Sequence, residues 1–190
     1  MKKWIAILLA LTLTMGLVAC GKTNQGNDAT DENKPADALE LLTNIWNGVP
    51  EEKRFFAMGG DMTNMVEGGP GKYSLEDEGL TSMLLVPEEQ IEKIDQAASL
   101  IHGMMVNNFT AGAVHLKEGS DVDSFANAVG EAIAKNPWMC GMPEHYTVAV
   151  IGGEYVLFYF GINDVIEPFA DSMKTVYPNA DVKFDEAIQG

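Results

Sequence analysis

The sequence predicts a single small α+β domain with a mainly antiparallel sheet packed by about four helices. Three observations lead to this prediction. Two apolar segments at 147–151 and 154–160 flank a Gly-Gly pair, which favours a β-hairpin over 147–160. An apolar, partly β-branched segment at 110–116 is typical of a strand. Apolar residues three or four positions apart over 122–133 are typical of a helix with one buried face.

The first element of the domain is predicted to be a helix that begins at Asp37. Asp37 and Glu40 have capping-box spacing, and Gly48 and Pro50 supply the stop signal. The apolar face of this helix comprises Leu39, Leu42, Ile45 and Trp46. Residues 51–80 contain two Gly-Gly pairs, so we expect loops with one short helix in that region.

The middle of the domain is predicted to hold a helix followed by a strand. A helix is expected after Pro87, because proline suits a first helical turn and the apolar spacing that follows suits one buried stripe. The residues of that stripe are Ile91, Ile94, Ala98 and Ile101. Strand structure is expected over 104–107 and 110–116.

The third predicted helix follows the turn signal Gly119-Ser120-Asp121 and ends at Asn136-Pro137. Its buried stripe comprises Val122, Phe125, Ala126, Val129, Ala132 and Ile133. Gly152-Gly153 then favours a two-residue type I′ turn, because glycine accepts positive φ twice. The second hairpin strand is apolar on both faces. It is therefore either a central strand covered on both sides or a strand with one exposed binding face.

The last predicted helix uses Asn163 or Asp164 as its cap and ends before Tyr177-Pro178. Pro168 is expected only in its first turn, because proline lacks the N–H that a later position must donate. These elements place the globular domain at residues 37–190.

Residues 1–19 have the features of a bacterial lipoprotein signal peptide. Lys2 and Lys3 supply a basic start, residues 4–18 carry no charge, and Leu17-Val18-Ala19-Cys20-Gly21 has lipobox order. The thiol of Cys20 would receive a diacylglyceryl group before cleavage. An uncleaved transmembrane helix is the alternative, but the apolar run is shorter than the roughly 20 residues that a span needs. Residues 20–36 would then form the lipidated N-terminus and a disordered tether.

The charge of the chain limits its partners. The whole chain has 12 basic and 28 acidic residues. Removal of the signal takes away Lys2 and Lys3 and no acid, so 10 basic residues remain and the net charge becomes −18. Such a surface repels nucleic acid and anionic headgroups and favours cationic partners. We therefore expect no nucleic-acid partner, and membrane contact only through the lipid.

One cluster of soft side chains stands out. Residues 139–145 contain Met139, Cys140, Met142 and His145. Two thioethers, a thiol and an imidazole suit Cu(I), so these four are candidate metal ligands. The alternative is an apolar connection between helix and hairpin that caps the core. A second acidic group, formed by Glu118, Asp121 and Asp123, is interpreted as helix-capping charge.

Two short motifs stand out within residues 87–177, namely Met142-Pro143-Glu144-His145-Tyr146 and Gly153-Glu154-Tyr155-Val156-Leu157. On these motifs the segment resembles a domain-of-unknown-function family found in small lipoproteins of Gram-positive anaerobic bacteria. The resemblance implies an exported α+β domain and transfers no catalytic residue. It does not extend to residues 37–86.

The function predicted from the sequence is an exported, lipid-anchored accessory or binding module of the cell envelope, attached to the cell membrane and facing outside the cytoplasm. No cofactor beyond the covalent diacylglycerol on Cys20 is expected, and an envelope protein or the cell wall is the expected partner. The common enzyme motifs are absent from the sequence, so no catalytic residue is assigned. The alternatives are a soft-metal or small-ligand chaperone that uses residues 139–145, and an enzyme with a site built from acids in 51–86.

Overall fold

The structure is a computed structural model that describes residues 34–139 and 141–189. The predictions made for the signal peptide, for Cys20 and for Cys140 lie outside these residues. The described chain begins at Lys34, three residues ahead of the predicted domain boundary, and Pro35 is already buried. Among the described residues, no helix has both the length and the apolar character needed to cross a membrane.

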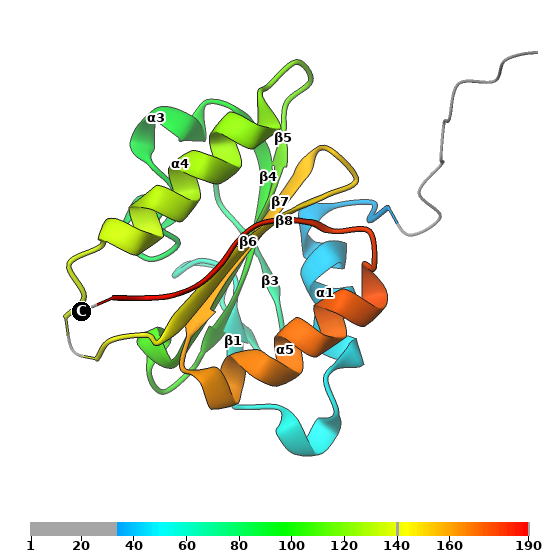
Figure 1. Ribbon diagram of the computed structural model, residues 1–190, viewed down its shortest axis with the longest axis vertical. Coiled ribbons are helices and arrows are strands. Elements are labelled where there is room, and N and C mark those ends of the chain that lie inside the picture. Colours follow the sequence, from blue (N-terminus) through cyan, green and yellow to red (C-terminus); the bar gives the residue numbers. More distant parts are fainter. Residues whose placement is uncertain (1–33, 140, 190) are drawn as a thin grey trace, which may run out of the picture. The chain divides into compact units, whose positions relative to one another are not determined.

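An eight-stranded antiparallel sheet forms the centre of the α+β domain (Figure 1). Its order is β2-β1-β4-β5-β7-β6-β8, and the short β3 shares with β1 the edge of β4 that faces away from β5. The strands are β1 (Ala57–Gly59), β2 (Val66–Glu67), β3 (Gly71–Tyr73), β4 (Ile94–His102), β5 (Phe109–Leu116), β6 (His145–Ile151), β7 (Tyr155–Gly161) and β8 (Asp181–Ala187).

Helices cover both faces of the sheet. The α-helices are α1 (Ala38–Gly48), α2 (Gly79–Ser82), α3 (Glu88–Ile91), α4 (Val122–Lys135) and α5 (Asn163–Val176), and the 3-10 helices are η1 (Glu51–Lys53) and η2 (Val106–Asn108). Helices α1 and α5 pack on one face, whereas α4 with the short α2 and α3 packs on the other. The fold class predicted from the sequence is therefore confirmed.

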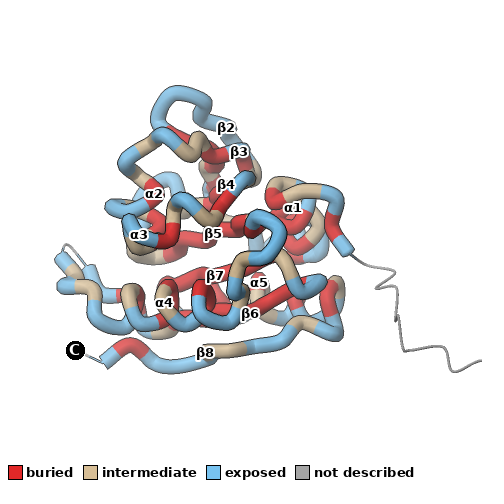
Figure 2. The backbone as a smooth tube through the Cα atoms, turned by 90° about the horizontal axis from the view of Figure 1, so that it is seen from above, coloured by how far each residue is buried: buried red, intermediate tan, exposed pale blue. Residues whose placement is uncertain are grey.

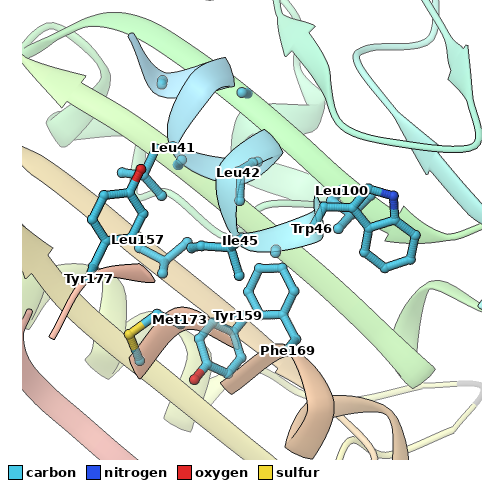
Figure 3. Packing of buried hydrophobic residues seen from close by; sticks show 14 of the residues in the cluster. Leu41, Leu42, Ile45, Trp46, Leu100, Leu157, Tyr159, Phe169, Met173 and Tyr177 are labelled. Carbon is cyan, nitrogen blue, oxygen red and sulfur yellow. The ribbon is translucent and has the colours of Figure 1, made fainter. Parts of the chain in front are cut away.

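Two hydrophobic cores result, one on each face. Side chains alternate along β7, so Leu157 and Tyr159 enter the core under α1 and α5, while Val156 and Phe158 enter the core under α4. Figure 3 shows Ile45 of α1 meeting Leu157, Tyr159 and residues of α5 in the first core. All seven residues of β7 are buried, which confirms a central strand covered on both sides (Figure 2).

Several predicted termini are confirmed. Asp37 is the N-cap of α1 and accepts a hydrogen bond from the Glu40 amide at 2.7 Å. Asp121 is the N-cap of α4 and accepts one from the Ser124 amide at 2.9 Å. Helix α4 ends at Lys135, directly before Asn136-Pro137.

The prediction for the hairpin loop needs a correction. The closing pair is Ile151 and Tyr155, so the loop has three residues and includes Glu154. It is therefore not a two-residue type I′ turn, although Gly152 and Gly153 do have positive φ, at 61° and 73°.

The predicted long helix after Pro87 is wrong. Only one turn forms, α3, and residues 94–102 are strand β4. Ile94 and Ala98 of the predicted stripe are buried, but Ala97, Ser99 and Leu100 outside it are also buried. Residues 97–100 are buried without a break because β4 lies inside the sheet with helices on both faces, so burial does not follow a helical period.

Other segments also differ from the sequence predictions. Residues 104–105 are an exposed bend and 106–107 belong to η2, so this segment is not a strand. Residues 51–80 include three short strands where loops were expected, and β8 was not predicted. Pro168 is the sixth residue of α5 rather than part of its first turn.

The N-cap of α5 is Ile162, neither of the two predicted residues. Its side chain makes no capping hydrogen bond. The Glu144 carboxylate, remote in sequence, accepts the Asn163 amide at 2.9 Å in its place.

Candidate functional site

The connector between α4 and β6 holds the four candidate metal ligands predicted from the sequence. Met139 is 80% exposed and Met142 is 40% exposed. The prediction for Cys140 lies outside the described residues. Among the described residues, no group of three or more histidine, cysteine or acidic side chains has a metal-binding arrangement. Two of the four candidates are therefore exposed thioethers on one short segment.

His145, the fourth candidate, is already engaged. Its Nε2 lies 2.7 Å from Oδ1 of Asp185 on β8. Burial raises the pKa of Asp185, but hydrogen bonds from His145 and Thr147 outweigh burial and hold this pKa below its ordinary value. This hydrogen bond occupies Nε2 and leaves Nδ1 as the ring nitrogen that could bind a metal. In this arrangement His145 joins β6 to β8.

A second methionine-rich segment lies against the connector. Asn107, in η2, donates its side-chain amide to the carbonyl of Met139 at 3.0 Å and to that of Gly141 at 2.7 Å. The terminal methyl of Met105 lies 3.7 Å from the position that a Cβ at Gly141 would occupy. The β4–β5 turn therefore lies against the connector, and the two hydrogen bonds from Asn107 join them.

Phe56, the residue directly before β1, extends the surface of these two segments. The Gly103 amide donates to the carbonyl of Phe56 at 2.8 Å, and the Phe56 ring lies over Gly103. Phe56 remains 51% exposed. We define the methionine surface as the exposed apolar residues of these three segments: Phe56, Met104, Met105, Val106, Met139 and Met142.

Exposed apolar residues in this chain are mostly methionine. Six of the nine methionines in the described residues are exposed, namely Met62, Met65, Met104, Met105, Met139 and Met142. No leucine or isoleucine is among the large exposed apolar residues of the described part. Methionine is unbranched and polarisable, so it adapts to irregular partner surfaces better than leucine does. The abundance of methionine is visible in the sequence, but its exposure depends on the fold.

The opposite end of the sheet carries a charged cluster around His115. Its Nδ1 lies 2.5 Å from Oδ1 of Asp95, and its Nε2 lies 3.2 Å from Oε1 of Glu154. Lys34 contacts the same Glu154 oxygen at 2.8 Å. Burial raises the pKa of Glu154, but Lys34 and His115 outweigh burial and hold this pKa below its ordinary value.

This cluster holds segments together. Both ring nitrogens of His115 face carboxylate oxygens, so as placed the ring ties β4 to the β6–β7 loop. The aliphatic part of Lys34 lies on Gly152 of the same loop, within 3.3 Å of the position that a Cβ would occupy. The N-terminal segment is therefore attached at the hairpin end of the sheet.

Two acids within residues 51–86 accept hydrogen bonds from backbone amides. Asp61 is 3% exposed and accepts the amides of Thr63, Asn64 and Ser74. Asp77 accepts the amide of Gly79 at 2.7 Å. These two carboxylates are occupied by loop and helix amides, although Asp77 also lines a surface pocket with Glu76, Glu78 and Glu88.

The acidic group at the start of α4 is split between two roles. Asp121 caps α4, as interpreted from the sequence. Asp123 pairs instead with Lys183 of β8 at 2.8 Å. The Lys183 ammonium also contacts Asp181, and these hydrogen bonds raise the pKa of Lys183.

Comparison with known proteins finds no match: no family model, no curated protein and no solved structure is similar to this chain. The resemblance to the lipoprotein family of unknown function therefore stays a prediction.

Proposed function

We propose that this protein is an exported, lipid-anchored binding module of the bacterial cell envelope. The signal peptide and Cys20 supply the anchor in this proposal. The observation that carries the binding role is the methionine surface. Apolar groups gathered on the outside of a protein mark interaction sites more often than chance, because water contact with them is unfavourable. An adaptable thioether surface suits recognition of another macromolecule.

The arrangement of the domain supports this role. Strand β5 begins at Phe109, beside the methionine surface, and runs to Leu116, beside the His115 cluster. Eight residues of strand span about 25 Å. The chain enters the domain at Lys34, on the His115 side. In Figure 1 the β6–β7 loop and the α4–β6 connector likewise lie at opposite ends of the sheet. The chain therefore enters the domain at the end of the sheet opposite the methionine surface.

Site-specific photo-crosslinking in cells tests this proposal. A photoreactive residue at Met104 should yield an adduct with an envelope component, because Met104 is 79% exposed within the surface. The same residue at Glu118, exposed at the opposite end of β5, is the control and should yield none. Cys20→Ala should abolish lipid processing and release the chain from the membrane. Equal labelling from both positions, or membrane retention of the Cys20→Ala chain, would contradict the proposal.

The second candidate is a soft-metal chaperone. Met105 favours it, because its side chain reaches the connector that bears Met139 and Met142 and so adds a third thioether. Thioethers are ligands for Cu(I). Equilibrium dialysis with Cu(I) should then show retention that falls several-fold in both Met105→Leu and Cys140→Ser, with Met65→Leu as the matched control. No retention, or retention that these variants leave unchanged, would remove this candidate.

A further inference from the structure

We propose that the methionine surface binds the apolar face of a cationic amphipathic helix on a partner protein. This inference rests on the proposed binding function and names the partner's chemistry. The apolar centre of the surface supplies adaptable contacts for one face of a helix, the mode in which helices enter hydrophobic surfaces. The sign of the partner's charge follows from the residues around it and from the chain as a whole.

Carboxylates adjoin the methionine surface. Glu144 follows Met142 by two residues and is exposed, with its carboxylate on the first amide of α5. Asp164, in the same first turn, is also exposed, and the Ile162 amide just before it donates to the carbonyl of Asn108 in η2. Asp185 lies beside His145 at the start of β6. Glu144 and Asp164 therefore border the connector and η2, and Asp185 lies further along β6.

Two nearby cations, Lys135 and Arg54, are engaged within the domain, whereas Lys174 of α5 lies close enough to Asp185 to lower its pKa. Lys135 pairs with Glu131 at 2.7 Å, and Arg54 donates to the carbonyls of Asn47 and Val49. The chain after residue 19 carries a net charge of −18, with 10 basic against 28 acidic residues. A basic partner is attracted to this surface, whereas an anionic membrane or a second copy of the chain is repelled.

Peptide binding to the domain tests the inference. Every residue of both cores lies within residues 38–188, so a chain of residues 21–190 retains all of the core packing. The probe is a Leu/Lys helical peptide of about 18 residues, or five turns, with its leucines on one face. Its control has the same composition with leucines distributed around the helix. We expect the patterned peptide to bind at least about tenfold more tightly at physiological salt.

Paired variants locate the binding. Met104→Gln with Met139→Gln should weaken binding of the patterned peptide about tenfold. Met62→Gln with Met65→Gln is the matched control, because these methionines are exposed outside the methionine surface, and it should leave binding unchanged. All four side chains are at least half exposed, so the thermal midpoint should not move.

Three results would overturn the inference. Equal binding of both peptides would show attraction by charge alone, and no binding of either would exclude this partner class. Concentration-dependent dimerisation that the Met104/Met139 variant abolishes would assign the surface to a second copy. In each case a specific photo-adduct from Met104 in cells would still support the binding function, so the two proposals can fail separately.

Discussion

Gly59→Ala should destabilise the domain by about 3 kcal/mol or more, because the added methyl would meet backbone that cannot rotate away. A Cβ at Gly59 would lie 2.3 Å from the amide nitrogen of Gly71 and 2.4 Å from the carbonyl oxygen of Gly69. Strands β1 and β3 both pair with β4, at adjoining positions, so neither strand can withdraw without breaking sheet hydrogen bonds. Urea unfolding of the variant should show a lower midpoint with an unchanged slope.

Gly69→Ala is the matched control. Its added methyl would lie 3.7 Å from the Trp46 ring, an ordinary contact, and Gly69 does not have positive φ. We expect its stability to stay within about 0.5 kcal/mol of wild type. Equal stability of the two variants would show that β1 and β3 are not held in contact. Because Phe56 directly precedes β1, Gly59→Ala should also weaken peptide binding at the methionine surface.

Asp61→Ala should cost roughly 2 to 4 kcal/mol, because it leaves backbone donors in a largely buried site without their acceptor. The carboxylate accepts the amides of Thr63 and Asn64 at 2.8 Å and that of Ser74 at 3.0 Å. It thereby fixes the loop between β1 and β2 against the end of β3. Asp61→Asn should cost less, since the amide keeps one acceptor oxygen. Chemical denaturation at neutral pH measures both values.

The pH dependence of the Asp61 contribution has a defined sign. Burial raises the pKa of Asp61, but its hydrogen bonds outweigh burial, so its pKa in the folded state lies below the ordinary 3.8. A lowered folded pKa means that the contribution is complete above the unfolded pKa and is lost as the pH falls through the folded pKa. The stability difference between wild type and Asp61→Asn should therefore be constant at neutral pH and shrink below about pH 4. A difference that grows on acidification would contradict this assignment.

Elements with clear local signals at their ends were predictable from the sequence. Helix α4 has a regular apolar stripe between a capping aspartate and a proline, so the apolar spacing and the terminal residues both predict the same helix. The hairpin strands β6 and β7 were evident because two glycines separate two apolar segments. Asp37 marked the start of α1 because aspartate is a preferred N-cap residue.

Elements whose burial depends on distant residues were not predictable. Residues 97–100 of β4 are buried throughout, so their apolar spacing fitted a helix as well as a strand. Gly59 and Gly71 were interpreted as loop signals, whereas both lie in strands at a close backbone contact. Strand β8 has mostly exposed, charged residues and exists only because β6 offers it a free edge.

The candidate site was only partly visible in the sequence. Met139 and Met142 were named as candidates, but Met104, Met105 and Phe56 were not, because they come from other segments. Asn107 joins two of these segments by its hydrogen bond to Met139. The two residues are far apart in sequence, so no local pattern predicts this contact. His145 follows the connector, and its Nε2 is hydrogen-bonded to Asp185, which lies 40 residues later in the sequence.

Periodicity and capping are local properties of the chain, so the α+β class and the buried stripes of α1 and α4 could be predicted from the sequence alone. The anchor at Cys20 stays a prediction from lipobox order. The tertiary structure alone decided which apolar residues stay in water. Exposure depends on what packs against a side chain, and that neighbour is usually remote in sequence. The methionine surface therefore became visible only when β1, the β4–β5 turn and the α4–β6 connector met at one end of the sheet.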